Sequence, residues 1–263
     1  MAFRQGAITL VAFQVLSDRY YRGPLFSKEK MFNKIRRLLY SPFEKKYDFD
    51  KSNPLGGGGE RVDFTYHPQL KTSKLDVYQI NHYRRYEFAC KQINSGDVCG
   101  DFACGSGYGS AMLSQKAQKV IGIDIDQKVI TAIQQRYAHL GHLEYHCKNL
   151  LDLGFDNQFD NIISFETLEH FEEEEIKKIL NLFSRALKKG GKIIFSTPYM
   201  QADDEAARNL GFHKTFYINE DKIKSWLPNA GLENLSFSYQ NYQTHEIKSK
   251  LRQTDFIICV AQF

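Results

Sequence analysis

Apolar and polar residues alternate in two patterns along most of the chain. Short apolar runs such as Val120–Asp124 and Phe159–Phe165 have the length and composition of buried strands. Amphipathic stretches with helical spacing lie between such runs, among them Leu75–Ile93 and the highly charged Glu172–Leu187. Strands that alternate with helices are typical of an α/β domain. The other predicted strands are 97–103, 143–147, 192–196, 235–240 and 256–262, and the other predicted helices are 110–117, 127–137 and 222–227.

Residues 1–74 read as an accessory segment in front of a domain at residues 75–263. Lys28–Leu39 predicts a helix with one apolar and one basic face, and the four consecutive glycines in Pro54–Gly59 predict a flexible joint. Glu60–Pro68 follows the joint, so it is either a lid over a substrate or an ordinary surface loop.

Charge is unevenly distributed. Residues 1–62 carry 12 Lys and Arg against six Asp and Glu, although the whole chain has a net charge of only +4. The basic helix either contacts an anionic membrane surface or packs on its own domain with a solvated face. The overall charge is too small to imply nucleic acid by itself, and no RNA-binding module is visible.

Two further features bear on where the protein works. The early apolar run at residues 7–16 is too short to span a bilayer and lacks a signal-peptide cleavage pattern. The five cysteines have scattered spacings that fit neither a disulfide framework nor a zinc site. We therefore expect a soluble, cytoplasmic protein with reduced thiols.

The sharpest chemical signal is Val98–Gly109, with the sequence VCGDFACGSGYG. A strand ends, glycines follow at alternate positions and a helix begins, which lets the backbone approach a ligand closely. The spacing is Gly-x-Gly-x-Gly, whereas dinucleotide-binding loops have Gly-x-Gly-x-x-Gly. Asp101 stands just before the loop, where a carboxylate favours a ligand with an amino group and a sulfonium over a pyrophosphate.

Asp124 ends the next predicted strand, 17 residues after Gly107. A carboxylate there can accept hydrogen bonds from both hydroxyls of a ribose, which any nucleoside cofactor offers. The alternative is an N-cap of the following helix, for which Asp126 is better placed.

The residues around the glycine loop resemble the motifs of a known family. DxACGSGYGS resembles motif I of class I S-adenosylmethionine-dependent methyltransferases, and VIGIDID resembles their ribose-binding strand. Later segments of the family are resembled in the same order by KNLLDLGF, FDNIISFETLEHF and LKKGGKIIFSTP. The upstream segment HYRRYEFA is similar to a helix of small-molecule and sugar methyltransferases. Gly100 and Ala103 depart from motif I, where a bulky apolar residue and a glycine are usual, so we expect a slightly altered loop.

The resemblance implies a seven-stranded, mostly parallel sheet with helices on both faces and an antiparallel last strand. It also implies S-adenosylmethionine as the cofactor. The residues that it assigns to cofactor binding are Tyr86, Asp101, Ala103, Gly105, Gly107, Tyr108, Asp124, Ile125, Asn149, Leu150 and Phe165.

Candidate catalytic residues follow the predicted strands at their carboxyl ends. His170 and His213 are candidate general bases, with a helix-bracing residue and a surface residue as the alternatives. Glu166 and Glu169 either orient an acceptor or help to hold a metal, but too few ligands converge in the sequence to predict a metal site.

The acceptor is predicted only by class. Ser164–Thr167 differs from the Asn-Pro-Pro-Tyr arrangement of amino-nitrogen methylation, so we expect methylation of an oxygen on a small molecule or glycan, in polysaccharide or glycoconjugate biosynthesis. Two other classes stay open: an RNA or protein methyltransferase that docks through the basic segment, and a non-catalytic cofactor-binding subunit.

Overall fold

The computed structural model describes Leu55 and residues 61–263, apart from the side chains of residues 206, 209 and 210. The predicted helix Lys28–Leu39 and the glycines of the predicted joint lie outside the described residues. Among the described residues no helix is long and apolar enough to span a membrane. The described residues 61–74 lie against the rest of the domain, and the predicted boundary after residue 74 stays a prediction.

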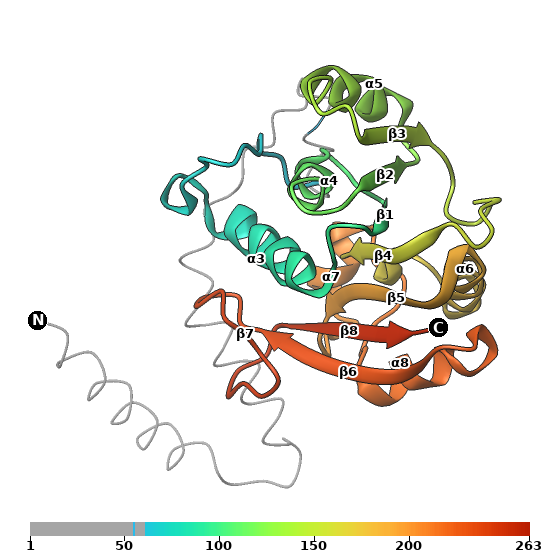
Figure 1. The fold of residues 1–263 in the computed structure, drawn as a ribbon. Coiled ribbons are helices and arrows are strands. Elements are labelled where there is room, and N and C mark those ends of the chain that lie inside the picture. The colour runs from blue at the N-terminus through green and yellow to red at the C-terminus, as the bar shows by residue number, and fades with distance from the viewer. Residues whose placement is uncertain (1–54, 56–60) are drawn as a thin grey trace, which may run out of the picture. The chain divides into compact units, whose positions relative to one another are not determined.

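A sheet of eight strands in the order β3-β2-β1-β4-β5-β8-β6-β7 forms the centre of the described chain (Figure 1). The strands are β1 (Val98–Phe102), β2 (Lys119–Asp124), β3 (Leu143–Cys147), β4 (Phe159–Phe165), β5 (Leu187–Pro198), β6 (Glu233–Gln240), β7 (Ile247–Lys248) and β8 (Phe256–Gln262). The helices are α3 (Val77–Gln92), α4 (Tyr108–Leu113), α5 (Gln127–Arg136), α6 (Glu173–Ala186), α7 (Glu205–Leu210) and α8 (Glu220–Trp226), with 3-10 turns at Thr72–Lys74, Leu168–His170 and Pro228–Ala230.

Strands β1 to β5 pair in parallel, and β8 runs antiparallel to both β5 and β6. The predicted mostly parallel sheet with an antiparallel last strand is confirmed. The sheet has eight strands and not the predicted seven, because β7 pairs antiparallel with β6 through two residues only. A strand of that length produces no periodic signal in the sequence.

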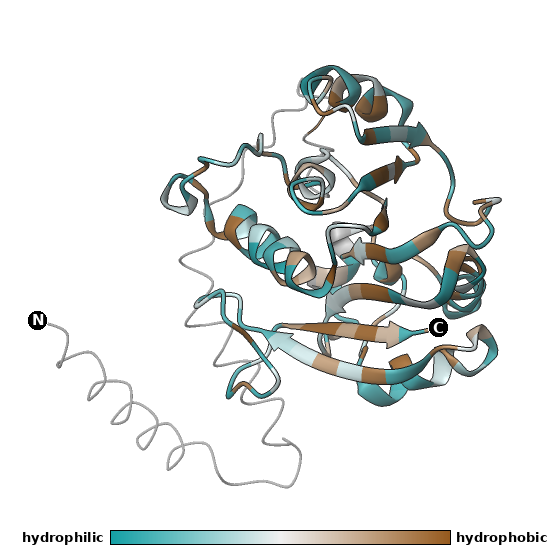
Figure 2. Cartoon of the chain, viewed as in Figure 1, coloured by the Kyte–Doolittle hydropathy of each residue, from teal (hydrophilic) through white to brown (hydrophobic). Residues whose placement is uncertain are grey.

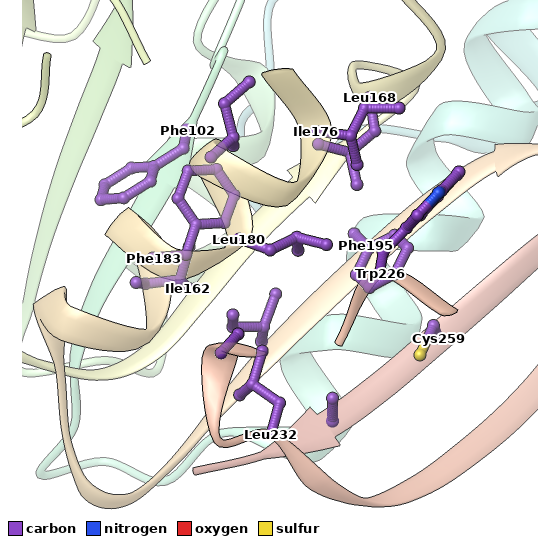
Figure 3. Close-up of a cluster of buried hydrophobic side chains, with 14 of the residues drawn as sticks. Phe102, Ile162, Leu168, Ile176, Leu180, Phe183, Phe195, Trp226, Leu232 and Cys259 are labelled. Carbon is purple, nitrogen blue, oxygen red and sulfur yellow. The ribbon is translucent and has the colours of Figure 1, made fainter. Parts of the chain in front are cut away.

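Neighbouring isoleucines on the central strands point to opposite faces of the sheet. Ile162 of β4 and Ile193 of β5 join a core that includes buried residues of α6 and α8, among them Ile176 and Trp226 (Figure 3). The residues that follow them, 163 and 194, join a second core with α3 and α4. Helices therefore cover both faces, as expected for strands that read as continuous apolar runs.

Side-chain caps fix where several helices begin. Asp76 starts α3 with a capping box, and Asp126 accepts from Lys128 N and Val129 N at the start of α5. The N-cap role predicted for Asp126 is confirmed, which leaves Asp124 available for another function. Figure 2 shows β8 brown along most of its length and α3 and α5 with both teal and brown residues, as expected for half-buried helices.

The segment Lys188–Gly191 differs from the prediction. The sequence predicts that it ends the preceding helix with basic residues and a glycine cap. In the structure α6 already ends at Ala186, and β5 begins at Leu187. Gly190 adopts a φ of +80° and donates to the carbonyl of Phe263, so these glycines shape the irregular start of a strand.

Candidate functional site

The strand order reverses between β1 and β4, because the chain passes from β1 outward to β3 and then returns to the other side of β1. In open α/β sheets, ligands bind beyond the carboxyl ends of the strands at such a reversal. Three predicted segments meet this edge: the glycine loop after β1, Asp124 at the end of β2, and Glu166 directly after β4.

The glycine loop contains three left-handed residues, with φ of +62° at Ala103, +53° at Gly105 and +76° at Gly107. An alanine in this region costs about 1 kcal/mol relative to glycine, which explains why the family pattern has glycine there. The loop therefore keeps the glycine conformation at Ala103 and stores strain. Gly100 is the other departure from the pattern. A Cβ added there would lie only 2.5 Å from the Phe102 ring, so that ring occupies the space of a larger side chain.

Asp101 is fully buried at the end of β1 and ties two helices to the loop. Its carboxylate accepts from the Tyr86 hydroxyl at 2.8 Å and from Ser110 Oγ at 2.5 Å. Burial raises the pKa of Asp101 to about 6, although both hydrogen bonds work against this rise. With both oxygens engaged by the protein, attraction of the cofactor to this carboxylate stays a prediction.

The predicted ribose contact, Asp124, is 7% exposed and accepts from the backbone N–H of Gly105 and of Asp126, each at 3.0 Å. Ile125 beside it is 68% exposed, which is high for an apolar side chain. Asn149 is exposed just beyond β3, and Leu150 next to it is buried. An anchored carboxylate, an exposed apolar side chain and an exposed amide on adjacent strand ends fit a ribose and an adenine.

Part of the segment Glu60–Pro68, for which the sequence leaves a lid and a surface loop open, contacts the glycine loop. Residues 61–66, called the strap here, hold it by a hydrogen bond from Ser106 Oγ to the Val62 carbonyl, 3.0 Å long. Phe64 stacks on Tyr108 with ring centroids 4.1 Å apart. Arg61 lies 3.7 Å from the Asp124 carboxylate. This segment therefore packs on the glycine loop, and its role as a lid over a substrate stays a prediction.

Across the reversal, Glu166 adopts a φ of +52°, a strained conformation that concentrates at functional sites. Its carboxylate accepts from Ser196 Oγ at 2.7 Å and lies 3.8 Å from Arg85 Nη1. Arg85 is 1% exposed, donates through Nε to Gln240 at 2.8 Å and stacks over Phe256. Sequence periodicity gave no sign that this arginine is buried.

The two predicted histidines lie together. The rings of His170 and His213 are 5.0 Å apart between centroids, and Glu169 lies beside them with an exposure of 1%. Burial lowers the pKa of His213 to about 4, with a smaller contribution from His170, so His213 is a weak base at neutral pH. The structure therefore brings together two of the candidate bases, His170 and His213, with Glu169. The Glu166 carboxylate is close enough to Glu169 to act on it electrostatically.

Two predicted cofactor residues are buried between α3 and the loop. Tyr86 packs edge-on against Phe165, with ring centroids 5.0 Å apart. A Cβ on Gly109 would lie 2.0 Å from the Tyr86 ring, so glycine permits this close approach. Tyr108 hydrogen-bonds His82 Nδ1 at 2.8 Å. The cofactor contacts of these residues stay predictions.

Comparison with known proteins agrees with this arrangement. Residues 100–191, from the glycine loop to the start of β5, match the family described as "Methyltransferase domain". Residues 100–191 therefore contain a methyltransferase domain, within a Rossmann-like fold.

Individual relatives share part of the chain. "Probable S-adenosylmethionine-dependent methyltransferase MT3114" of Mycobacterium tuberculosis is 25% identical over 160 residues, which cover 59% of this chain and 55% of the relative. "Ubiquinone biosynthesis O-methyltransferase" of Idiomarina loihiensis is 32% identical over 159 residues, 59% of this chain and 58% of the relative. The chain spans about half the length of the curated relatives it matches.

Solved structures share the fold. A crystal structure of an S-adenosylmethionine-dependent methyltransferase from Clostridium acetobutylicum superposes with a TM-score of 0.55 at 16% identity. The superposition covers 74% of this chain and 95% of that one.

Proposed function

We propose that this protein transfers the methyl group of S-adenosylmethionine to an oxygen of a small molecule or glycan. The observation that carries the proposal is the reversal of strand order, with Asp124 and the glycine loop on one side and Glu166 and His170 on the other. One side fits a nucleoside, and the other offers acceptors for the proton of a hydroxyl.

The residues have defined tasks in this scheme. Asp124 binds the ribose hydroxyls, and the loop backbone lies against the cofactor. The cofactor supplies an electrophilic methyl group, so the acceptor oxygen forms the new bond to carbon while the carbon–sulfur bond breaks with its electron pair going to sulfur. His170 or Glu166 takes the hydroxyl proton. Most of the rate acceleration then comes from alignment of the two substrates.

Similarity to a ubiquinone biosynthesis O-methyltransferase supports an oxygen acceptor. Transfer to a glycan rests on the resemblance of HYRRYEFA, residues 82–89, to sugar methyltransferases.

The test is incorporation of label from methyl-labelled S-adenosylmethionine into a cell extract, separated into small-molecule, glycan, RNA and protein fractions for mass spectrometry. We expect label in the small-molecule or glycan fraction, and much less of it with the Asp124→Ala variant at the same cofactor concentration. Label in RNA or protein would contradict the acceptor class. Tight cofactor binding without transfer to any fraction would contradict the enzymatic activity itself.

A further inference from the structure

Three possible metal ligands lie together beyond the carboxyl end of β4: Glu169, His170 and His213. Glu169 and His170 belong to the 3-10 turn Leu168–His170, and His213 lies between α7 and α8. Each side chain places one potential ligand atom within 4.8 Å of the other two. The carbonyl of Glu169 accepts from Lys214 N at 2.8 Å and Thr215 N at 3.1 Å, which holds the segment of His213 against the turn.

Both imidazole rings are oriented by an acceptor on their Nδ1 side. His170 Nδ1 lies 3.1 Å from the carbonyl oxygen of Phe212, and His213 Nδ1 lies 2.7 Å from Oε1 of Gln201. Because these oxygens only accept, each Nδ1 carries a hydrogen, which leaves Nε2 as the ring nitrogen that can bind a metal. Metal-binding histidines are typically fixed in this way, with the second ring nitrogen donating to a carbonyl or carboxylate.

The carboxyl group of Glu169 is buried without a hydrogen bond in the described part of the chain. It is 1% exposed, and neither of its oxygens has a hydrogen-bond partner. Buried polar groups nearly always have partners, so two bare carboxylate oxygens need an explanation. Arg85 is a buried cation 3.8 Å from the Glu166 carboxylate, and its charge also acts on Glu169, but it donates no hydrogen bond to Glu169. A buried carboxyl group without a hydrogen-bond partner therefore lies within 4.8 Å of a ring nitrogen of each histidine.

We propose that Glu169, His170 and His213 bind one divalent transition-metal ion. Two imidazoles and one carboxylate suit zinc and related ions, whereas magnesium and calcium prefer ligand sets made of oxygen. Three protein ligands leave an open coordination position, as in catalytic zinc sites. Zinc–ligand distances of about 2.1 Å require the three side chains to converge by roughly an ångström on binding.

The inference rests on the proposed function for its role in the reaction. Glu169, His170 and His213 would hold the ion, and the ion would supply a Lewis acid that lowers the pKa of an acceptor hydroxyl. His170 then acts as a ligand, and proton uptake passes to Glu166 or to solvent.

The test is calorimetric titration of Zn²⁺ into the full chain without a histidine tag. We expect one ion per chain, and at least about 100-fold weaker binding for Glu169→Gln and for His213→Ala. The matched control is His146→Ala, because His146 is an exposed histidine 3.7 Å from Glu144 and its removal tests for adventitious binding. That variant should bind as the wild type does. Circular dichroism checks the folding of each variant, and Glu169→Gln nearly preserves side-chain volume.

Unchanged binding in Glu169→Gln, or loss of binding in His146→Ala alone, would overturn the inference. Methyl transfer by a wild-type protein that binds no zinc would overturn it while leaving the proposed function intact. Zinc binding lost in the cluster variants supports the site even if no fraction of the extract is methylated, an outcome that would count against the proposed function alone.

Discussion

The Tyr86 hydroxyl donates a 2.8 Å hydrogen bond to the buried carboxylate of Asp101, and thereby joins α3 to the strand that enters the glycine loop. A tyrosine and an aspartate on different elements thus hold the loop from inside the protein. The same contact places a titratable group in the core, where its ionisation affects folding.

Asp101→Asn should change the pH dependence of stability. Burial raises the pKa of Asp101 from 3.8 to about 6, so the folded state favours the protonated form. The stability that this group contributes is present below pH 4 and is lost as the pH rises through 6, a change of roughly 3 kcal/mol. Urea unfolding at pH 4 and pH 7.5 measures it. We expect the variant to gain relative to wild type at the higher pH, and parallel pH profiles would contradict the assignment.

Asp124→Ala should weaken the binding of S-adenosylmethionine about 100-fold, because two hydrogen bonds to a charged acceptor are lost at about 1.5 kcal/mol or more each. Asp126→Asn is the matched control, since asparagine also caps a helix well. Calorimetry with both variants decides the ribose assignment. Near-normal affinity in Asp124→Ala would exclude it.

Ala103→Gly should stabilise the protein by about 1 kcal/mol, because glycine adopts the left-handed conformation without strain. Ala111→Gly offers a control of opposite sign, since Ala111 is fully buried in α4 and glycine weakens helices. Thermal unfolding of both variants compares them directly. A loss of stability in Ala103→Gly would show that the loop is not strained at this position.

His170→Ala should lower the rate of methyl transfer at least about 100-fold, whether His170 takes the proton or holds an ion. The affinity for S-adenosylmethionine should change less than about twofold, because the glycine loop and Asp124 lie on the other side of the strand reversal. The fractionated-extract assay and calorimetry measure the two quantities separately. An unchanged rate would remove His170 from the reaction.

The elements of the sheet could be predicted well from the sequence. The limits of β3, β4 and β8 agree with the predicted ones to the residue, because each is an apolar or alternating run that begins directly after a polar residue. Tertiary structure decided the rest. Helix α7 and the two-residue β7 are too short to give a periodic signal, and Gly190 looks like a helix cap because glycine also suits an irregular strand.

The candidate site was predictable only in part. Asp124 and Glu166 could be predicted because they follow strands, whose carboxyl ends meet at one edge. Glu169 lies near His213 because its carbonyl accepts two backbone hydrogen bonds from residues 214 and 215, which follow β5 in the chain. Arg85 is buried against Gln240 and Phe256, more than 150 residues later in the sequence. Such long-range contacts leave no local pattern.

The antiparallel strand β8 lies between β5 and β6, although it is the last of the eight strands in the chain. During synthesis on the ribosome, β6 therefore lacks its neighbour until Phe256–Gln262 has emerged, and β5 exposes an open edge for the same period. Unpaired edges of this kind attract other chains. The nascent domain should consequently need protection from aggregation until β8 has paired with β5 and β6. Truncation of the chain shortly before residue 256 should yield insoluble protein.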